Sequence, residues 1–93
     1  MKNMNIEDIF SSKLRMKILK VLHNVGELNV SEIARRLNIN YMSASKHMKI
    51  LEDENILQHK HFGRIRLYRL NEKSAKAKAV QNLIDTWQHQ NNK

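Results

Sequence analysis

The feature that most constrains this chain is the segment of residues 28–55, LNVSEIARRLNINYMSASKHMKILEDEN. The apolar residues of its first half recur at helical spacing: Val30, Ile33, Ala34 and Leu37. Asn29 precedes them, and Glu32 follows three residues later, which is the capping-box pattern of a helix start. We therefore predict a short helix that begins directly after Asn29.

A sharp turn and a second helix follow. Asn38 lies where the chain must turn, and asparagine tolerates the left-handed backbone conformation better than most residues. Asn40 can cap the second helix. The inward face of this helix would carry three apolar side chains, those of Ala44, Met48 and Leu51. This order predicts a helix-turn-helix at residues 29–54, and in proteins with this motif the second helix, here 41–54, enters the DNA major groove.

The pattern changes at residue 56. Two short β-prone runs, ILQHKH and RIRLYRL, flank a polar connection that contains Gly63, which predicts a β-hairpin at residues 56–70. Three further helices are expected from apolar stripes at helical spacing: one at residues 6–10, one at residues 74–90, and one that Ser11 or Ser12 can cap and that ends before Gly26. The stripe of the helix before Gly26 carries Leu14, Ile18 and Leu22, with Val21 as a further candidate.

Charge is segregated along the chain. The 93 residues carry a formal net charge of +8, and a chain of this length forms one domain, residues 1–93, with limited capacity to bury a core. Residues 13–26 and residues 56–70 each carry four positive charges and no acid, whereas three acids follow one another at the end of the second motif helix. This distribution indicates a polyanionic partner, with nucleic acid ahead of an anionic membrane.

Several classes of function are excluded or disfavoured. The chain has no cysteine, which excludes disulfides, thiolate metal sites and thiol redox sensing. No apolar run approaches the ~20 residues that span a bilayer, and the N-terminus lacks the apolar core of a signal peptide, so we expect a cytoplasmic, nucleoid-associated protein. No phosphate-binding glycine loop and no nucleophile–base pattern is present, so we expect neither catalysis nor a cofactor.

Three segments resemble the ArsR-type winged-helix transcriptional regulators: SSKLRMKILKVL, NVSEIARRLNINYMSASKHMKILEDENIL and GRIRLYRLN. The resemblance extends from about residue 6 to residue 71. It implies a mainly α-helical fold with a small β-hairpin, a winged helix-turn-helix in which the hairpin is the wing. Many ArsR-like proteins sense metals through cysteines at the start of the first motif helix, but the corresponding segment here, residues 27–32, has no thiol, so that activity is not carried over.

The resemblance also implies a homodimer in which the first and last helices pack around a two-fold axis. The sequence supports this independently, because its terminal apolar stripes exceed what one small core needs. The candidate interface residues are Ile6, Ile9, Phe10, Val80, Leu83, Ile84 and Trp87. In the alternative, both stripes only cover their own domain. A dimer would place two recognition helices about one DNA turn apart, roughly 34 Å, over a pseudo-palindromic site.

Seven residues of the recognition helix are candidates for DNA contact: Asn40, Tyr41, Met42, Ser43, Ser45, Lys46 and Lys49. The two serines and Lys46 suit base edges, whereas Tyr41 and Met42 suit a thymine methyl group. Asn40 and Lys49 suit phosphates. Histidine is common at the position of His47 in ArsR-like recognition helices, and we expect its ring to be partly buried and hydrogen-bonded to the fold.

The wing supplies a second set of candidates around Gly63: Lys60, His61, Arg64 and Arg66. These side chains are expected to follow the phosphate backbone or to enter the flanking minor groove. One of Arg35 and Arg36, late in the first motif helix, is expected to reach the backbone. Arg69 is instead expected to pair with an acid of the body, and Phe62 to anchor the wing from beneath rather than to wedge against a sugar.

The sequence therefore predicts a sequence-specific, double-stranded DNA-binding transcriptional regulator, most often a repressor in such families. The alternative is an architectural, chromatin-like protein with little sequence preference, which the small size, the high charge and the lack of an effector site favour. No metal is expected, because His59 with His61, and Asp85 with His89, are pairs that lack further ligands.

Overall fold

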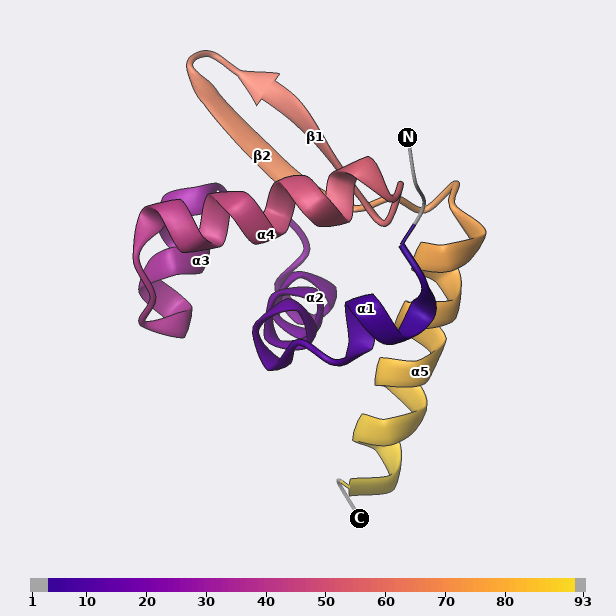
Figure 1. Ribbon diagram of the computed structural model, residues 1–93. Helices are drawn as coiled ribbons and strands as arrows, with labels where there is room; N and C mark the ends of the chain where they lie inside the picture. The colour runs from indigo at the N-terminus through magenta and orange to yellow at the C-terminus, as the bar shows by residue number, and fades with distance from the viewer. Residues whose placement is uncertain (1–3, 92–93) are drawn as a thin grey trace.

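The computed structural model describes residues 4–91, which form five helices and one antiparallel two-stranded sheet. The elements follow in the order α1 (Ile6–Phe10), α2 (Lys13–Val25), α3 (Val30–Leu37), α4 (Tyr41–Asp53), β1 (Leu57–Phe62), β2 (Ile65–Leu70) and α5 (Ala75–Asn91) (Figure 1). The sheet is a hairpin that projects beyond the helices, next to α4. This is the mainly α-helical winged helix-turn-helix that the sequence predicts.

Asparagine side chains set the ends of both motif helices. The Asn29 side chain accepts a hydrogen bond from the Glu32 N–H at 2.8 Å, and the Glu32 carboxylate accepts one from the Asn29 N–H at 2.9 Å, so the capping box is confirmed. Asn38 has the left-handed conformation, with φ 57° and ψ 48°. The Asn40 side chain accepts from the Ser43 N–H at 2.7 Å. All three predicted turn and cap positions are confirmed.

Replacing Asn29 with alanine should lower the free energy of unfolding by about 1 kcal/mol, because the first turn of α3 loses its side-chain acceptor. Chemical denaturation monitored by circular dichroism measures this. Asn82→Ala on an exposed stretch of α5 is the control and should change stability by less than about 0.5 kcal/mol. Equal losses in both variants would contradict a capping function for Asn29.

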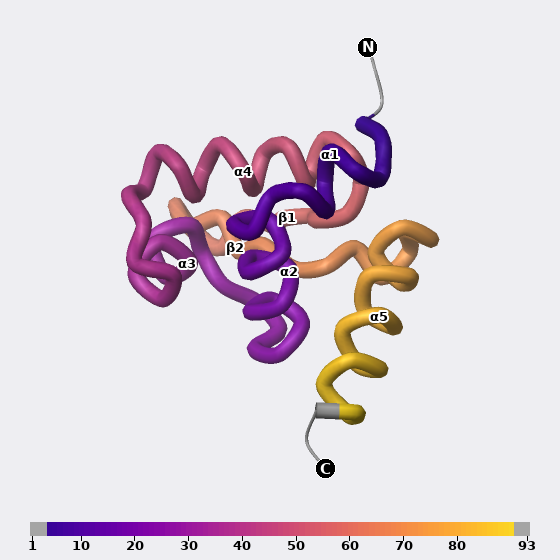
Figure 2. The backbone as a smooth tube through the Cα atoms, turned by 60° about the horizontal axis from the view of Figure 1, so that its bottom comes forward, coloured from indigo at the N-terminus to yellow at the C-terminus, as the bar shows by residue number. Residues whose placement is uncertain are grey.

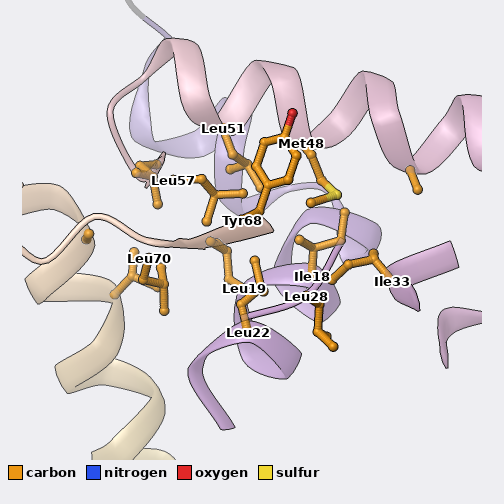
Figure 3. Packing of buried hydrophobic residues seen from close by; sticks show 14 of the residues in the cluster. Ile18, Leu19, Leu22, Leu28, Ile33, Met48, Leu51, Leu57, Tyr68 and Leu70 are labelled. Atoms are coloured by element: carbon orange, nitrogen blue, oxygen red, sulfur yellow. The ribbon is translucent and has the colours of Figure 1, made fainter. Parts of the chain in front are cut away.

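The core lies around α2, which packs against every other helix and against β2. Side chains from α2, α4 and the base of the hairpin meet there (Figure 3). The stripe predicted for α2 identified Ile18 and Leu22, which are buried, but it missed the equally buried Leu19 and included Leu14, which is only half-buried. A central helix buries more than one side, and a single amphipathic stripe does not predict this.

The hairpin is anchored at its base and exposed at its tip. Leu57 pairs with Leu70 at the base, and Phe62 pairs with Ile65 next to the turn. Leu28 exchanges two backbone hydrogen bonds with Tyr68, at 3.1 and 2.9 Å, which fix β2 to the segment before α3. Phe62 is 71% exposed, so the prediction that it anchors the wing from beneath is wrong: its place at the tip is beyond the reach of the core.

Helix α5 lies at the opposite end of the domain from α3 in both views (Figures 1 and 2). Glu54, which follows α4, connects this end to the recognition helix. Its carboxylate accepts hydrogen bonds from Lys76 Nζ at 2.9 Å and from the Met4 N–H at 3.0 Å, and only 6% of the residue is exposed. The bond from Lys76, followed by that from Met4, lowers the pKa of Glu54.

Acid should therefore destabilise the protein through Glu54. Because the folded-state pKa of Glu54 lies below its ordinary value of 4.5, its contribution to stability is present above that pH and is lost as pH falls through the folded pKa. We expect Glu54→Gln to flatten the fall of Tm on the acid side of 4.5. Thermal denaturation over a pH series measures this, with the exposed Glu7→Gln as control. Parallel curves for Glu54→Gln and the wild type would contradict the prediction.

Candidate nucleic-acid interface

Helix α4 has one buried face, one exposed ridge and two flanks. Its buried side chains are those predicted: Ala44, Met48 and Leu51. At about 100° per residue, the side of the helix opposite them carries Met42, Lys46 and Lys49, all of which are exposed. Met42 is 80% exposed, so its side chain is accessible for contact. This ridge is the surface that α4 offers to a groove.

The flanks of α4 divide the remaining candidates. Tyr41 and Ser45 are one turn apart on the flank that faces the wing and the start of α3. Ser43 is half-buried on the other flank, on the same side as His47. The seven candidates of the recognition helix therefore do not form one surface.

His47 is half-buried, as expected, but its Nδ1 is shielded from solvent and has no hydrogen-bond partner among the described residues. The ring was expected to form a hydrogen bond with the fold, and its shielded nitrogen forms none with the described residues. Burial lowers the pKa of His47, and the positive charges of Arg15 and Lys46 lower it further. Because the ordinary value is 6.5, this lowered pKa favours the neutral imidazole at pH 7.

Ion pairs separate the wing cations into two groups. Lys60 Nζ lies 3.4 Å from a Glu27 carboxylate oxygen. Arg69 lies 3.8 Å from the same oxygen and 3.4 Å from Glu72, so its predicted pairing with an acid of the body is confirmed. Within residues 4–91, Arg64 and Arg66 make no ion pair and are exposed next to the hairpin turn. These two arginines are the wing charges available to a polyanion.

A polar cleft of about 270 Å³ joins the wing to the helix-turn-helix. The residues that line it come from the start of α3, the first turns of α4, and β2 with the turn before it: Asn29, Val30, Ser31, Tyr41, Ser45, Arg64, Ile65, Arg66 and Tyr68. It therefore brings together candidates that were predicted separately on the recognition helix and on the wing. Ser31 was missed, and no sequence signal identifies it, because its place in the cleft depends on how β2 packs.

The other predicted contact residues are spread over the end of α3, over α4 and near the wing tip. Arg35 and Arg36 are exposed in the last turn of α3. Lys49 lies 3.6 Å from Asp53, but both side chains are at least half exposed, so this pair holds the lysine only weakly. Asn40 and His61 are exposed at the start of α4 and near the wing tip.

Two of the histidines are each paired with a single acid. His23 Nε2 lies 2.5 Å from an Asp85 carboxylate oxygen, and His59 Nδ1 lies 2.5 Å from Glu52. His89 Nδ1 lies 2.8 Å from the backbone oxygen of Asp85. In the described part of the chain, no three histidine, aspartate or glutamate side chains are grouped as a metal site requires. None of the helices described there is long and apolar enough to cross a membrane.

The sequence comparison identifies the family. A profile described as "Bacterial regulatory protein, arsR family" matches residues 12–59, just over half of the chain. The chain belongs to the ArsR family of bacterial regulatory proteins. It is accordingly a DNA-binding transcriptional regulator, and the matched residues run from the cap of α2 through the helix-turn-helix into β1.

Solved structures of other regulators share the fold of this ArsR-family chain. The transcriptional repressor BigR from Xylella fastidiosa has a TM-score of 0.76 at 23% identity, over 89% of this chain and 80% of that chain. HlyU from Vibrio vulnificus has a TM-score of 0.73 at 25% identity, over 86% and 80%. A winged helix-turn-helix domain from Mycobacterium bovis, described as homodimeric, has a TM-score of 0.71 at 22% identity, over 91% and 73%. The comparison with curated proteins found no match.

The terminal helices of this ArsR-family protein expose part of their apolar stripes. Three of the seven candidate interface residues, Ile9, Val80 and Ile84, are buried in the core of the chain itself and offer little surface to a partner. The other four are exposed: Ile6, Phe10, Leu83 and Trp87. Residues of α1 and α5 line a common groove of about 340 Å³, and Leu83 lies at the junction of this groove with a second one between α5 and α2.

Proposed function

We propose that this ArsR-family regulator is a sequence-specific repressor that binds double-stranded DNA as a homodimer, with α4 in the major groove and the wing on the flanking backbone or minor groove. One observation carries the proposal. The ridge of α4 centred on Lys46 is exposed to solvent. The wing, in turn, presents Arg64 and Arg66, which form no ion pairs among the described residues. A sequence-reading element and a charge-tracking element are thus separate surfaces.

The ridge of α4 is suited to base edges. Lys46 is placed to donate to guanine O6 and N7, and Met42 to contact a thymine methyl group. Ser43 adds a hydroxyl next to this ridge. Because the ridge has no Arg, Asn or Gln to form bidentate pairs, direct discrimination is modest, and DNA shape contributes to the choice of site.

The backbone contacts surround this ridge. We assign phosphates to Asn40 at the start of α4, to Lys49, and to one of Arg35 and Arg36. The wing adds the strongest charges through Arg64 and Arg66, with smaller contributions from His61 and from Lys60, whose charge Glu27 partly offsets. These contacts bring affinity and register, and the binding they provide weakens as salt rises.

Dimerisation follows from the exposed apolar side chains of the terminal helices. Trp87 is 66% exposed and Ile6 is 71% exposed, and burial of such apolar surface at a contact between two copies would stabilise a dimer. A two-fold axis at this surface would set two copies of α4 on one face of the DNA. Repression would then result from occupation of promoter DNA.

Selection of bound duplexes from a random-sequence pool, followed by footprinting near physiological salt, tests the proposal. We expect an inverted repeat with half-sites about one helical turn apart. An unenriched pool with continuous, salt-sensitive coverage would favour the architectural alternative, to which the net charge of +8 is also suited. Transcription in vitro from a promoter that overlaps the site should fall as protein is added, and a rise would show activation instead.

One lysine variant and one arginine variant should distinguish contacts to base edges from contacts to the DNA backbone. Lys46→Ala should cost about 1–3 kcal/mol at the preferred site and relax its sequence preference. Arg64→Ala should weaken binding to all sequences alike and flatten the salt dependence by about one unit of slope. Binding titrations at several salt concentrations measure both, with the exposed Lys78→Ala on α5 as control. A uniform loss in Lys46→Ala would remove its base-reading assignment.

A further inference from the structure

We propose that the polar cleft between α3, α4 and β2 holds one phosphate of the DNA backbone in each half-site. The phosphate would accept hydrogen bonds from the hydroxyls of Ser31, Tyr41 and Ser45, while Arg64 and Arg66 neutralise its charge. This inference rests on the proposed function and deepens it. It assigns Ser31 for the first time, and it moves Tyr41 and Ser45 from base edges to the backbone.

The chemistry of the lining matches an anion. Beside the buried Tyr68, three hydroxyl-bearing residues and two arginines line the cleft of about 270 Å³, and none of its lining residues carries a carboxylate. Glu32, the nearest acid along the chain from Ser31, directs its carboxylate to the Asn29 N–H at 2.9 Å and is thereby held at the helix start. Guanidinium groups and hydroxyls both donate hydrogen bonds to phosphate oxygens, and this cleft brings the two kinds of donor together.

The backbone at the start of α3 adds to the site. The Asn29 side chain accepts from the N–H of Glu32, and Ile33 is the first residue whose N–H donates within the helix, to the Asn29 carbonyl at 3.1 Å. The N–H groups of Val30 and Ser31 therefore have no intrahelical acceptor and point out of the helix start. The Leu28–Tyr68 bridge holds β2 beside this turn with hydrogen bonds of 3.1 and 2.9 Å. The cleft is therefore assembled before any ligand arrives, which limits the entropy lost on binding.

The position of Ser31 allows a substitution whose effect on DNA affinity can be distinguished from its effect on the stability of the fold. Ser31 is an exposed residue in the first turn of α3, where a negative charge stabilises the helix. Ser31→Asp should therefore keep or raise Tm, yet repel a phosphate in the cleft and weaken binding to all DNA by about tenfold or more. Ser74→Asp is the matched control, because it makes the same charge change at the cap of α5, where aspartate replaces serine well.

Affinities for the selected duplex decide the outcome. Ser74→Asp should stay within about twofold of the wild type, which accounts for the change in net charge alone. If Ser31→Asp binds as tightly as Ser74→Asp, the cleft holds no phosphate and the inference is overturned. The proposed function would survive that result, because the wild type would still bind its selected site.

Duplexes that each carry one neutral methylphosphonate locate the phosphate directly. In each half-site we expect one position at which the modification weakens wild-type binding by about fivefold, whereas the Ser31→Ala/Tyr41→Phe variant, already weakened, loses nothing further there. Additive losses at every position would overturn the inference. Failure of the wild type to bind any duplex would overturn the proposed function as well, so the two failures are distinguishable.

Discussion

Truncation of Leu83 and Trp87 to alanine should convert the proposed dimer to a monomer and weaken its binding to a full inverted repeat by about 10²-fold or more, because the second half-site is then no longer reached intramolecularly. Both side chains are exposed in the single chain, at 41% and 66%, so their loss should leave the fold of each protomer almost unchanged. Sedimentation velocity measures the oligomeric state, and titration of full-site and half-site duplexes measures the loss of avidity.

The control for this variant is Asn82→Ala/Thr86→Ala, which removes two exposed side chains from another side of α5. It should dimerise and bind as the wild type does. An unchanged dimer in Leu83→Ala/Trp87→Ala would exclude the C-terminal helix from the interface. A monomeric variant that retained full affinity for the inverted repeat would show instead that dimerisation is not needed for binding.

Leu19→Ala should lower the free energy of unfolding by about 2–5 kcal/mol, the range for truncation of a fully buried leucine. Leu19 lies on α2, has no exposed surface and sits where the hairpin base and the helices meet (Figure 3). Domains of this size have total stabilities of about 5–15 kcal/mol, so the variant should be partly unfolded at elevated temperature. Denaturant titration at fixed pH gives the value.

Leu14→Ala is the matched control, since it makes the same chemical change on the same helix at a half-buried position. Its loss should be well below that of Leu19→Ala, because less apolar surface leaves water when the chain folds. Equal losses would mean that burial in the structure does not rank the side chains of α2. DNA affinity measured at low temperature should be retained in both variants, because neither side chain reaches the DNA-facing side.

Local interactions explain which parts of the fold were predictable. Asn29, Asn38 and Asn40 act on backbone groups within three or four residues, so their chemistry is visible in the sequence, and the structure confirms each. The inward face of α4 was also predictable, since one period of 3.6 residues describes a helix packed on one side. The limits of the hairpin followed from a change in residue type and from Gly63, whose φ is +66°.

The features that were missed depend on neighbours distant in the sequence. Leu19 is buried because α2 is surrounded, and Phe62 is exposed because the hairpin extends past the core. Of the three acids at the end of α4, Glu54 is buried between Lys76 and the Met4 N–H, which the charge pattern did not predict. Its partners lie 22 and 50 residues away, a distance over which no sequence pattern specifies contact.

The candidate interface divides in the same way. Helical period, capping and charge are properties of short segments, so the sequence alone predicted α4 as the recognition helix and a basic wing. Only the tertiary structure decided that Lys60 is paired with Glu27, that Tyr41 and Ser45 turn toward the wing, and that Ser31 joins them. Those facts depend on the angle at which β2 packs against α3 and α4, which is set by the burial of side chains from every element at once.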